Sequence, residues 1–254
     1  MADILDRFIT AAKENVASGY YSGGGKFEGK SVSLREKLVA RRFSLIAEIK
    51  HASPAGEYSF DNIDVGKTAQ GFLKNGADAI SVVVEPQIFR GSLGNVAIAK
   101  KTGLPVLFKD FVISDEQIGA ASRVGADAML LVARACNRLE LDMDAMISKA
   151  HSLGLEVLLE CYDEQEMEAA LGTKADILGI NNRDLQTLKV DLGRTRDITE
   201  RFENIGKPLI SESGVRNRAD VEFLMGLGVK GVLVGTAIWK AADIGEKIRE
   251  LKGI

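Results

Sequence analysis

The stretch Leu45-Ile46-Ala47-Glu48-Ile49-Lys50-His51-Ala52-Ser53-Pro54 decides how the chain is interpreted. Its first half is an apolar run, which predicts a buried strand. Side chains alternate along a strand, so Glu48 and Lys50 share one face with Ile46. Buried charges are costly unless they are paired or used. The two charges therefore indicate a structural ion pair, a strand end that reaches solvent, or part of a functional site.

Composition limits the class of protein. The chain has 254 residues, of which 46% are apolar and 27% charged, as in an ordinary globular protein with a large core. Its net charge of −3 and pI of about 5.6 give no basic footprint for nucleic acid. No apolar run approaches the roughly 20 residues of a membrane span, and the N-terminus lacks the apolar segment of a signal peptide. Cys136 and Cys161 form no disulfide framework, so we expect a cytoplasmic protein with reduced thiols.

Apolar runs alternate with helical segments along most of the chain. Eight runs predict strands, at residues 45–50, 79–84, 105–108, 128–132, 157–159, 177–180, 208–210 and 231–234. Helical periodicity marks residues 65–74, 96–101, 116–124, 139–152, 164–171, 192–202, 219–227 and 244–251. The phrase Gly-Ala-Asp-Ala occurs at Gly76 and again at Gly125, a weak internal repeat. This order predicts an α/β fold, a (β/α)8 TIM barrel over residues 44–254. A doubly wound sheet is the alternative, but no Gly-x-Gly-x-x-Gly turn follows any of the runs.

Residues 1–43 precede the first strand and predict a helical extension packed on the barrel, within one structural domain. Apolar residues at helical spacing over 3–17 predict an amphipathic helix, and Ser33 is the expected N-cap of a second short helix over 33–38. Residues 20–29 include three consecutive glycines and predict a mobile loop.

Charged or amide side chains end several predicted strands. In a barrel of this kind, chemistry takes place at the carboxyl ends of the strands. Besides Glu48 and Lys50, these ends carry Lys109, Glu160, Asn181, Arg183 and Glu212. Several have the parity of inward-facing positions, so we expect them to converge on one mouth. Carboxylates and ammonium groups at close quarters shift one another's pKa values, which makes them candidate general acids and bases.

The loops after the last two strands predict a phosphate site. They contain Ser213-Gly214 and Gly235-Thr236, whose small side chains let backbone N–H groups approach an anion. Barrels often bind phosphate at this position. Ser53, in the loop after the first strand, is a candidate for an additional hydroxyl.

Seven phrases together are highly specific: 46–54, Phe89-Arg90-Gly91-Ser92-Leu93, Pro105-Val106-Leu107-Phe108-Lys109-Asp110-Phe111, Leu158-Leu159-Glu160, Gly179-Ile180-Asn181-Asn182-Arg183-Asp184-Leu185, Ser211-Glu212-Ser213-Gly214-Val215 and Val232-Leu233-Val234-Gly235. In these phrases, and in their order across nearly the whole chain, the protein resembles the indole-3-glycerol phosphate synthase family of tryptophan biosynthesis. The resemblance implies a phosphorylated substrate, 1-(2-carboxyphenylamino)-1-deoxyribulose 5-phosphate. The products would be indole-3-glycerol phosphate, CO2 and water. It implies no cofactor and no metal, in agreement with two scattered histidines and no Cys/His cluster.

The resemblance also implies roles for the strand-end residues. Lys109 would be the general acid for ring closure, Glu160 and Glu48 the acid–base carboxylates, and Lys50 a second cation. Asn181 and Glu212 would position the substrate and hold the ammonium groups, and Arg183 would meet the anthranilate carboxylate. The residues expected to line an aromatic pocket are Phe89, Phe111, Leu130 and Leu131, although core packing explains each of them equally well. Association with other tryptophan-pathway enzymes is a possibility that the sequence leaves open.

Some positions depart from the family pattern. They are Ala55, which stands where many members have lysine, Phe108 instead of arginine, Ala133-Arg134 after the fourth strand, and Thr236 instead of glutamate or serine. Two other functions remain open at this stage. One is a Schiff-base aldolase of similar fold with Lys109 as nucleophile, and the other is a barrel that only binds phosphate ligands or a partner enzyme.

Overall fold

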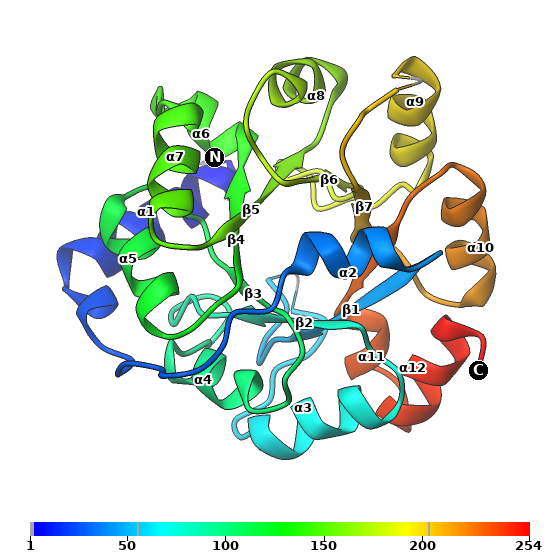
Figure 1. The fold of residues 1–254 in the computed structure, drawn as a ribbon, viewed down its shortest axis with the longest axis horizontal. Helices are drawn as coiled ribbons and strands as arrows, with labels where there is room; N and C mark the ends of the chain where they lie inside the picture. Colours follow the sequence, from blue (N-terminus) through cyan, green and yellow to red (C-terminus); the bar gives the residue numbers. More distant parts are fainter. Residues whose placement is uncertain (1–2, 55, 203) are drawn as a thin grey trace.

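Eight parallel strands close into a barrel, with each strand hydrogen-bonded to the next and β8 to β1 (Figure 1). This computed structural model describes residues 3–54, 56–202 and 204–254. The strands are β1 Ser44–Ile49, β2 Ala79–Val83, β3 Val106–Lys109, β4 Ala128–Val132, β5 Glu156–Cys161, β6 Ile177–Asn181, β7 Leu209–Glu212 and β8 Gly231–Val234. Each predicted run overlaps one strand, so the barrel is confirmed and the doubly wound alternative is wrong.

Alternation along the strands separates two apolar layers. Leu45, Ala47 and Ile49 of β1 belong to the layer between barrel and helices, whereas Ile46 belongs to the barrel interior. The interior layer is completed by residues of the same kind from the other strands, including Leu107, Leu130, Leu158, Ile210 and Leu233. The predicted division of β1 into two faces is therefore confirmed, and Glu48 lies on the interior face above Ile46.

Helices surround the strands (Figure 1). Those of the barrel are α3 Val65–Lys74, α4 Gly94–Lys100, α5 Asp115–Arg123, α6 Ala133–Leu139, α7 Met143–Ser152, α8 Glu164–Leu171, α9 Gly193–Arg201, α10 Arg218–Gly226, α11 Thr236–Trp239 and α12 Ile244–Lys252. The prediction of a single helix over 139–152 is wrong at its start, because α6 ends at Leu139 and α7 begins at Met143. The chain leaves α6 with Glu140 in the left-handed conformation (φ 54°), and Asp142 caps α7 by accepting the N–H of Ala145.

The internal repeat corresponds to a repeated contact at the amino ends of the strands. Asp78 accepts the N–H of Leu45 at 2.9 Å, and Asp127 accepts the N–H of Val106 at 2.7 Å. Asp176 makes the third such bond, to the N–H of Val157 at 2.8 Å, although Lys174 stands where the repeat has glycine. Each carboxylate also meets a basic side chain, in turn Lys252, Lys100 and His151. These bonds join β1 to β2, β3 to β4 and β5 to β6.

The N-terminal extension wraps the barrel from one end to the other. Helix α1 (Ile4–Ala17) packs near α6, where Arg138 pairs with Asp3 and Asp6. Helix α2 (Leu34–Ala40) lies across the amino ends of the strands, on the viewer's side in Figure 1. Between them, the N–H of Val32 donates to Asp127 at 2.8 Å.

The segment predicted as a mobile loop is anchored in its first part. Residues Tyr20–Ser22 form a 3-10 turn, η1, in which Tyr21 is buried. The hydroxyl of Tyr20 donates to the carbonyl of Val84 at 2.8 Å, and the guanidinium of Arg123 donates to the carbonyls of Tyr21 and Gly23. Glycine content alone does not reveal these contacts, because they join segments distant in the sequence.

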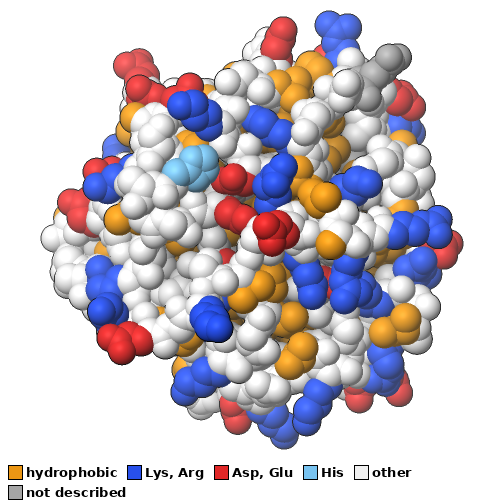
Figure 2. Space-filling model, in the orientation of Figure 1, with side chains coloured by type: hydrophobic (Ala, Val, Ile, Leu, Met, Phe, Trp, Pro, Cys, Tyr) orange, Lys and Arg blue, Asp and Glu red, His pale blue; other side chains and the backbone are white. Residues whose placement is uncertain are grey.

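The face of the molecule that includes helix α2 has a mixed surface. On the face shown in Figure 2, acidic and basic side chains are interspersed and hydrophobic ones lie in small groups. Among the described residues, no helix combines the length and the apolar character needed to cross a membrane.

Candidate active site

Lys109 lies at the centre of an ion-pair cluster at the carboxyl ends of the strands. Its ammonium is 2.7 Å from Oε2 of Glu212 and 3.4 Å from Oε2 of Glu160. These residues come from β3, β7 and β5, so the barrel brings together groups that are about 50 to 100 positions apart. Glu160 and Glu212 are buried, and the lysine is 18% exposed. Lys109 is therefore the most accessible of the three side chains to a ligand.

Glu48 and Lys50 form a second pair at the same mouth. Nζ of Lys50 is 2.6 Å from Oε1 of Glu48, and the glutamate is buried. Burial alone would raise the pKa of Glu48, but the charges of Lys50, Lys109 and Arg183 more than offset it and lower the pKa below its usual value. Glu48 is therefore ionised at neutral pH and able to act as a base.

The cluster contains three carboxylates and two ammonium groups, so its charges do not balance. Burial, together with the neighbouring charges of Glu160 and Glu48, raises the pKa of Glu212 to about 7, although Lys109 acts in the opposite direction. The same three carboxylates raise the pKa of Lys109 above its usual value, against the effect of burial. The lysine thus stays protonated, and near pH 7 Glu212 holds a proton part of the time, chiefly because it is buried.

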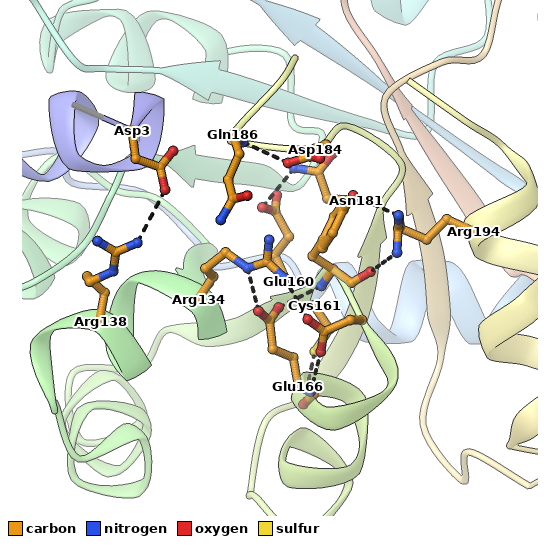
Figure 3. Close-up of polar contacts among 12 residues, drawn as sticks. Asp3, Arg134, Arg138, Glu160, Cys161, Glu166, Asn181, Asp184, Gln186 and Arg194 are labelled. Atoms are coloured by element: carbon orange, nitrogen blue, oxygen red, sulfur yellow. Dashed lines mark hydrogen bonds and ion pairs between the residues drawn. The ribbon is translucent and has the colours of Figure 1, made fainter. Parts of the chain in front are cut away.

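Asn181 orients a carboxylate and does not contact an ammonium group. Its Nδ2 donates to Oε1 of Glu160 at 2.9 Å, and its Oδ1 accepts the N–H of Arg183 at 3.0 Å. Figure 3 shows Asn181 beside Glu160 at the ends of β6 and β5. The prediction that Asn181 holds an ammonium group is therefore wrong in its contact, whereas Glu212 does hold the ammonium of Lys109.

The neighbouring Asn182 is a further site residue that was not predicted. Its side chain donates to Oγ of Ser211 and to the carbonyls of Glu212 and Ser213, at 2.8 to 3.0 Å. Its own oxygen accepts from Thr195. Asn182 thereby fixes the end of β7, where Glu212 and the loop that follows begin. The Asn-Asn pair in the sequence was the only signal.

A cavity of about 610 Å³ opens above the cluster. Phe89, Phe111 and Leu130 line it, as predicted, together with Phe8 of α1, which the sequence analysis did not select. The ring of Phe8 lies 5.5 Å from that of Phe89 and 4.8 Å from that of Phe111. We call these three rings the aromatic wall. The prediction for Leu131 is wrong, because alternation along β4 turns it outward into the helix-facing layer.

The opposite side of the mouth carries the predicted phosphate loops. Ser213, Gly214, Gly235 and Thr236 all line the cavity, after β7 and β8. Ser213 and Gly214 have φ of 65° and 95°, a left-handed pair that turns the chain sharply after β7. Three cations that the sequence analysis missed line the same cavity, namely Arg216, Lys240 and Lys247. Ser53 is not a lining residue; its hydroxyl donates at 2.9 Å to Glu57, which does line the cavity, and its contact with the ligand stays a prediction.

Two glycines make room for the buried carboxylates. A Cβ at Gly179 of β6 would lie 2.5 Å from Oε1 of Glu212, and a Cβ at Gly235 would lie 2.4 Å from Oε1 of Glu48. Real Cβ atoms do not approach other atoms so closely. A side chain at either glycine would therefore displace the carboxylate beside it, a constraint that the sequence context alone does not reveal.

Comparison with known proteins agrees with this geometry. The family model described as indole-3-glycerol phosphate synthase matches residues 18–251. The chain belongs to this family. The indole-3-glycerol phosphate synthase of Petrotoga mobilis is 36% identical, over 97% of this chain and 96% of its own length. That of Dehalococcoides mccartyi is 40% identical, over 87% and 85%. Among solved structures, a thiamine phosphate pyrophosphorylase from Pyrococcus furiosus shares the fold, with a TM-score of 0.61 and 19% identity over 87% of this chain and 96% of its own.

The structure accounts for most departures from the indole-3-glycerol phosphate synthase pattern. Phe108 is buried in the helix-facing layer, away from the cavity. Arg134, at the start of α6, pairs at 2.6 Å with Asp163 and with Glu166 (Figure 3). Its guanidinium also lies 4.1 Å from the centre of the Tyr162 ring. Thr236 lines the cavity. The departure at Ala55 falls outside the described residues.

Proposed function

We propose that the protein is an active indole-3-glycerol phosphate synthase, a carboxy-lyase. It would convert 1-(2-carboxyphenylamino)-1-deoxyribulose 5-phosphate into indole-3-glycerol phosphate, CO2 and water. One observation carries the proposal: the ammonium of Lys109 is held between Glu212 and Glu160 in a cavity bounded by the aromatic wall and by the small-residue loops after β7 and β8. Such a cavity suits a ligand with an aryl group at one end and a phosphate at the other.

Ring closure is the first step of this proposal. The aryl carbon attacks the ribulose carbonyl, and Lys109 donates a proton to the carbonyl oxygen as the new carbon–carbon bond forms. A general acid must be protonated at the working pH, and the carboxylates around Lys109 hold its pKa above the usual value. Loss of CO2 then restores the aromatic ring without an added electron sink.

Dehydration completes the reaction. The hydroxyl leaves as water with a proton from an acid, and a base removes the proton that remains on the ring system. We assign these steps to Glu160 and Glu48, which face the mouth from β5 and β1. Asn181 orients Glu160, and Glu212 orients Lys109. Lys50 and Arg183 line the same cavity and would pair with the substrate's anionic groups.

The direct test is a turnover assay with the carboxyphenylamino-deoxyribulose phosphate. Formation of indole-3-glycerol phosphate and CO2 is the expected result, and binding without turnover would support the barrel that only binds ligands. A Schiff-base aldolase needs a neutral amine as nucleophile, which the raised pKa of Lys109 disfavours. Borohydride with a carbonyl substrate should therefore trap no adduct on Lys109.

The remaining proposals follow from family membership alone. We infer a cytoplasmic location and a phosphorylated small molecule as the ligand. Association with other enzymes of tryptophan biosynthesis would be tested by co-purification of the intact protein from its host.

A further inference from the structure

Glu85 is a buried carboxylate that the proposed mechanism does not use. It follows β2, is 2% exposed, and lines the cavity. Its oxygens accept the backbone N–H groups of Gln87, Ile88 and Phe89 at 2.8, 2.6 and 2.9 Å. The side chain of Asn15 in α1 donates to it as well, at 3.2 Å. Glu85 therefore fixes the loop that carries Phe89 and ties it to the N-terminal helix.

Asp110 makes the same kind of contact after β3. It is 3% exposed, lines the cavity and accepts the N–H of Phe111 at 2.9 Å. The hydroxyl of Tyr21, in the N-terminal extension, donates to it at 2.6 Å, and Gln117 of α5 donates at 3.4 Å. Two carboxylates thus each hold the backbone of one phenylalanine of the aromatic wall, and each is bound by the extension that also supplies Phe8.

Core stability alone does not require these two charges. Among the described residues, neither carboxylate forms an ion pair, and burial raises the pKa of Asp110 to about 6. A buried charge without a cation is costly, and a neutral side chain would often be cheaper. What the charge does provide is strong hydrogen bonds that hold a loop in one conformation. Glu85 accepts three backbone N–H groups, and Asp110 accepts one backbone N–H together with two side-chain donors.

We propose that Glu85 and Asp110 are positioning residues for the aryl group of the substrate. They hold the backbones of Phe89 and Phe111 so that these rings and Phe8 form a preorganised slot before the ligand arrives. The inference rests on the proposed function for the nature of the ligand. The inference goes beyond that function because it gives the aromatic wall its own supporting contacts, which the barrel and the N-terminal extension supply together. These contacts are separate from the loops after β7 and β8 that would bind the phosphate.

The test uses two probes that occupy different halves of the site, anthranilate and inorganic phosphate. Calorimetry would measure the dissociation constant of each probe for the wild type and for Glu85→Gln and Asp110→Asn. Each substitution replaces a carboxylate by a neutral amide, which has one acceptor oxygen fewer and loosens the loop. We therefore expect the dissociation constant of anthranilate to rise about tenfold, corresponding to about 1.4 kcal/mol. The constant for phosphate should stay within about twofold. In turnover, KM should rise more than kcat falls.

Asp127→Asn is the matched control. Asp127 is also a buried carboxylate that accepts an N–H from the N-terminal extension, but it lies at the amino ends of the strands. This variant should lower Tm and leave both dissociation constants within about twofold of the wild type. Should a cavity-side variant fail to fold, two variants of the extension replace it. Asn15→Ala removes the hydrogen bonds of Asn15 with Glu85 and Gln87, and Tyr21→Phe removes those of the hydroxyl with Asp110 and Gln117. Both should shift anthranilate binding in the same direction.

The outcomes separate the two proposals. An equal rise of both dissociation constants, or unchanged anthranilate binding in folded variants, would overturn the positioning role. A wild type that binds both probes but does not turn over the substrate would refute the proposed function, and the probe measurements would still decide the positioning role.

Discussion

Each active-site charge has a defined environment that follows from its neighbours. Lys109 has two carboxylate partners, whereas Lys50 has one, Glu48. The lysine that would donate the catalytic proton is therefore the one with the greater negative charge around it, which keeps it protonated but also makes it a weak acid. A substrate that displaces one carboxylate would strengthen it as an acid.

Lys109→Ala should lower kcat by about 10²- to 10⁴-fold, the usual contribution of a general acid. KM should change much less, because the aromatic wall and the phosphate loops remain. Steady-state kinetics at saturating substrate would measure both. Lys100→Ala is the control, since Lys100 is a buried lysine paired with Asp127 at the other end of the barrel. It should lower Tm and leave kcat near that of the wild type, and a near wild-type kcat for Lys109→Ala would remove Lys109 from the mechanism.

The pH dependence of kcat/KM should report Glu212. Its folded-state pKa of about 7 lies above the ordinary 4.5, so the folded protein holds a proton there that it loses as pH rises through about 7. Only the ionised form pairs with Lys109, so kcat/KM should rise with pH with a midpoint near 7. The stability that this proton contributes is fully present below about pH 4.5 and is lost as pH rises through about 7. Glu212→Gln should flatten the kcat/KM limb, and a limb of unchanged midpoint in that variant would point to another group.

At the scale of elements, the regular part of the fold could be predicted and the contacts between distant segments could not. Periodicity located all eight strands, because an apolar run between turn residues is a local signal. Alternation also shows that the neighbouring residues Leu130 and Leu131 cannot both face the cavity. The wrong placement of Leu131 could therefore have been avoided from the sequence. In contrast, the contact of Asn181 with Glu160 depends on the register between β5 and β6, and the position of Phe8 depends on where α1 docks. Neither is encoded within a short stretch of sequence.

The bonds at the amino ends of the strands should contribute strongly to stability. Asp78 accepts the N–H of Leu45 and pairs with Lys252 at 2.6 Å and with Arg41 at 3.1 Å. Asp78→Ala leaves a buried donor and a half-buried ammonium without their acceptor, which should lower the free energy of unfolding by about 2–4 kcal/mol. Urea unfolding would measure it. Asp197→Ala, which removes an exposed partner of Arg196, should change stability by less than about 0.5 kcal/mol.

At the scale of the whole molecule, the two ends of the barrel have different tasks. The amino ends carry aspartates that accept backbone N–H groups and pair with basic side chains, which stabilises the fold. The carboxyl ends carry excess negative charge around Lys109 and a cavity with Arg216, Lys240 and Lys247 at the phosphate side. Because the cations line the cavity, an anion that binds there should stabilise the entire fold by mass action.

Inorganic phosphate should therefore raise Tm, and a substitution in the phosphate loops should abolish the effect. At a concentration of 100 times Kd, a ligand that binds only the folded state adds about 2.7 kcal/mol. Thr236 is the position to change, because a side chain at Gly235 would also collide with Glu48. Thr236→Asp places a like charge beside the phosphate and should remove the phosphate-dependent rise in Tm and increase KM. Thr236→Asn has nearly the same shape without the charge. It should therefore retain most of the phosphate-dependent rise in Tm and a KM close to that of the wild type. Equal behaviour of the two variants, measured by thermal unfolding with and without phosphate, would place the anion elsewhere in the cavity.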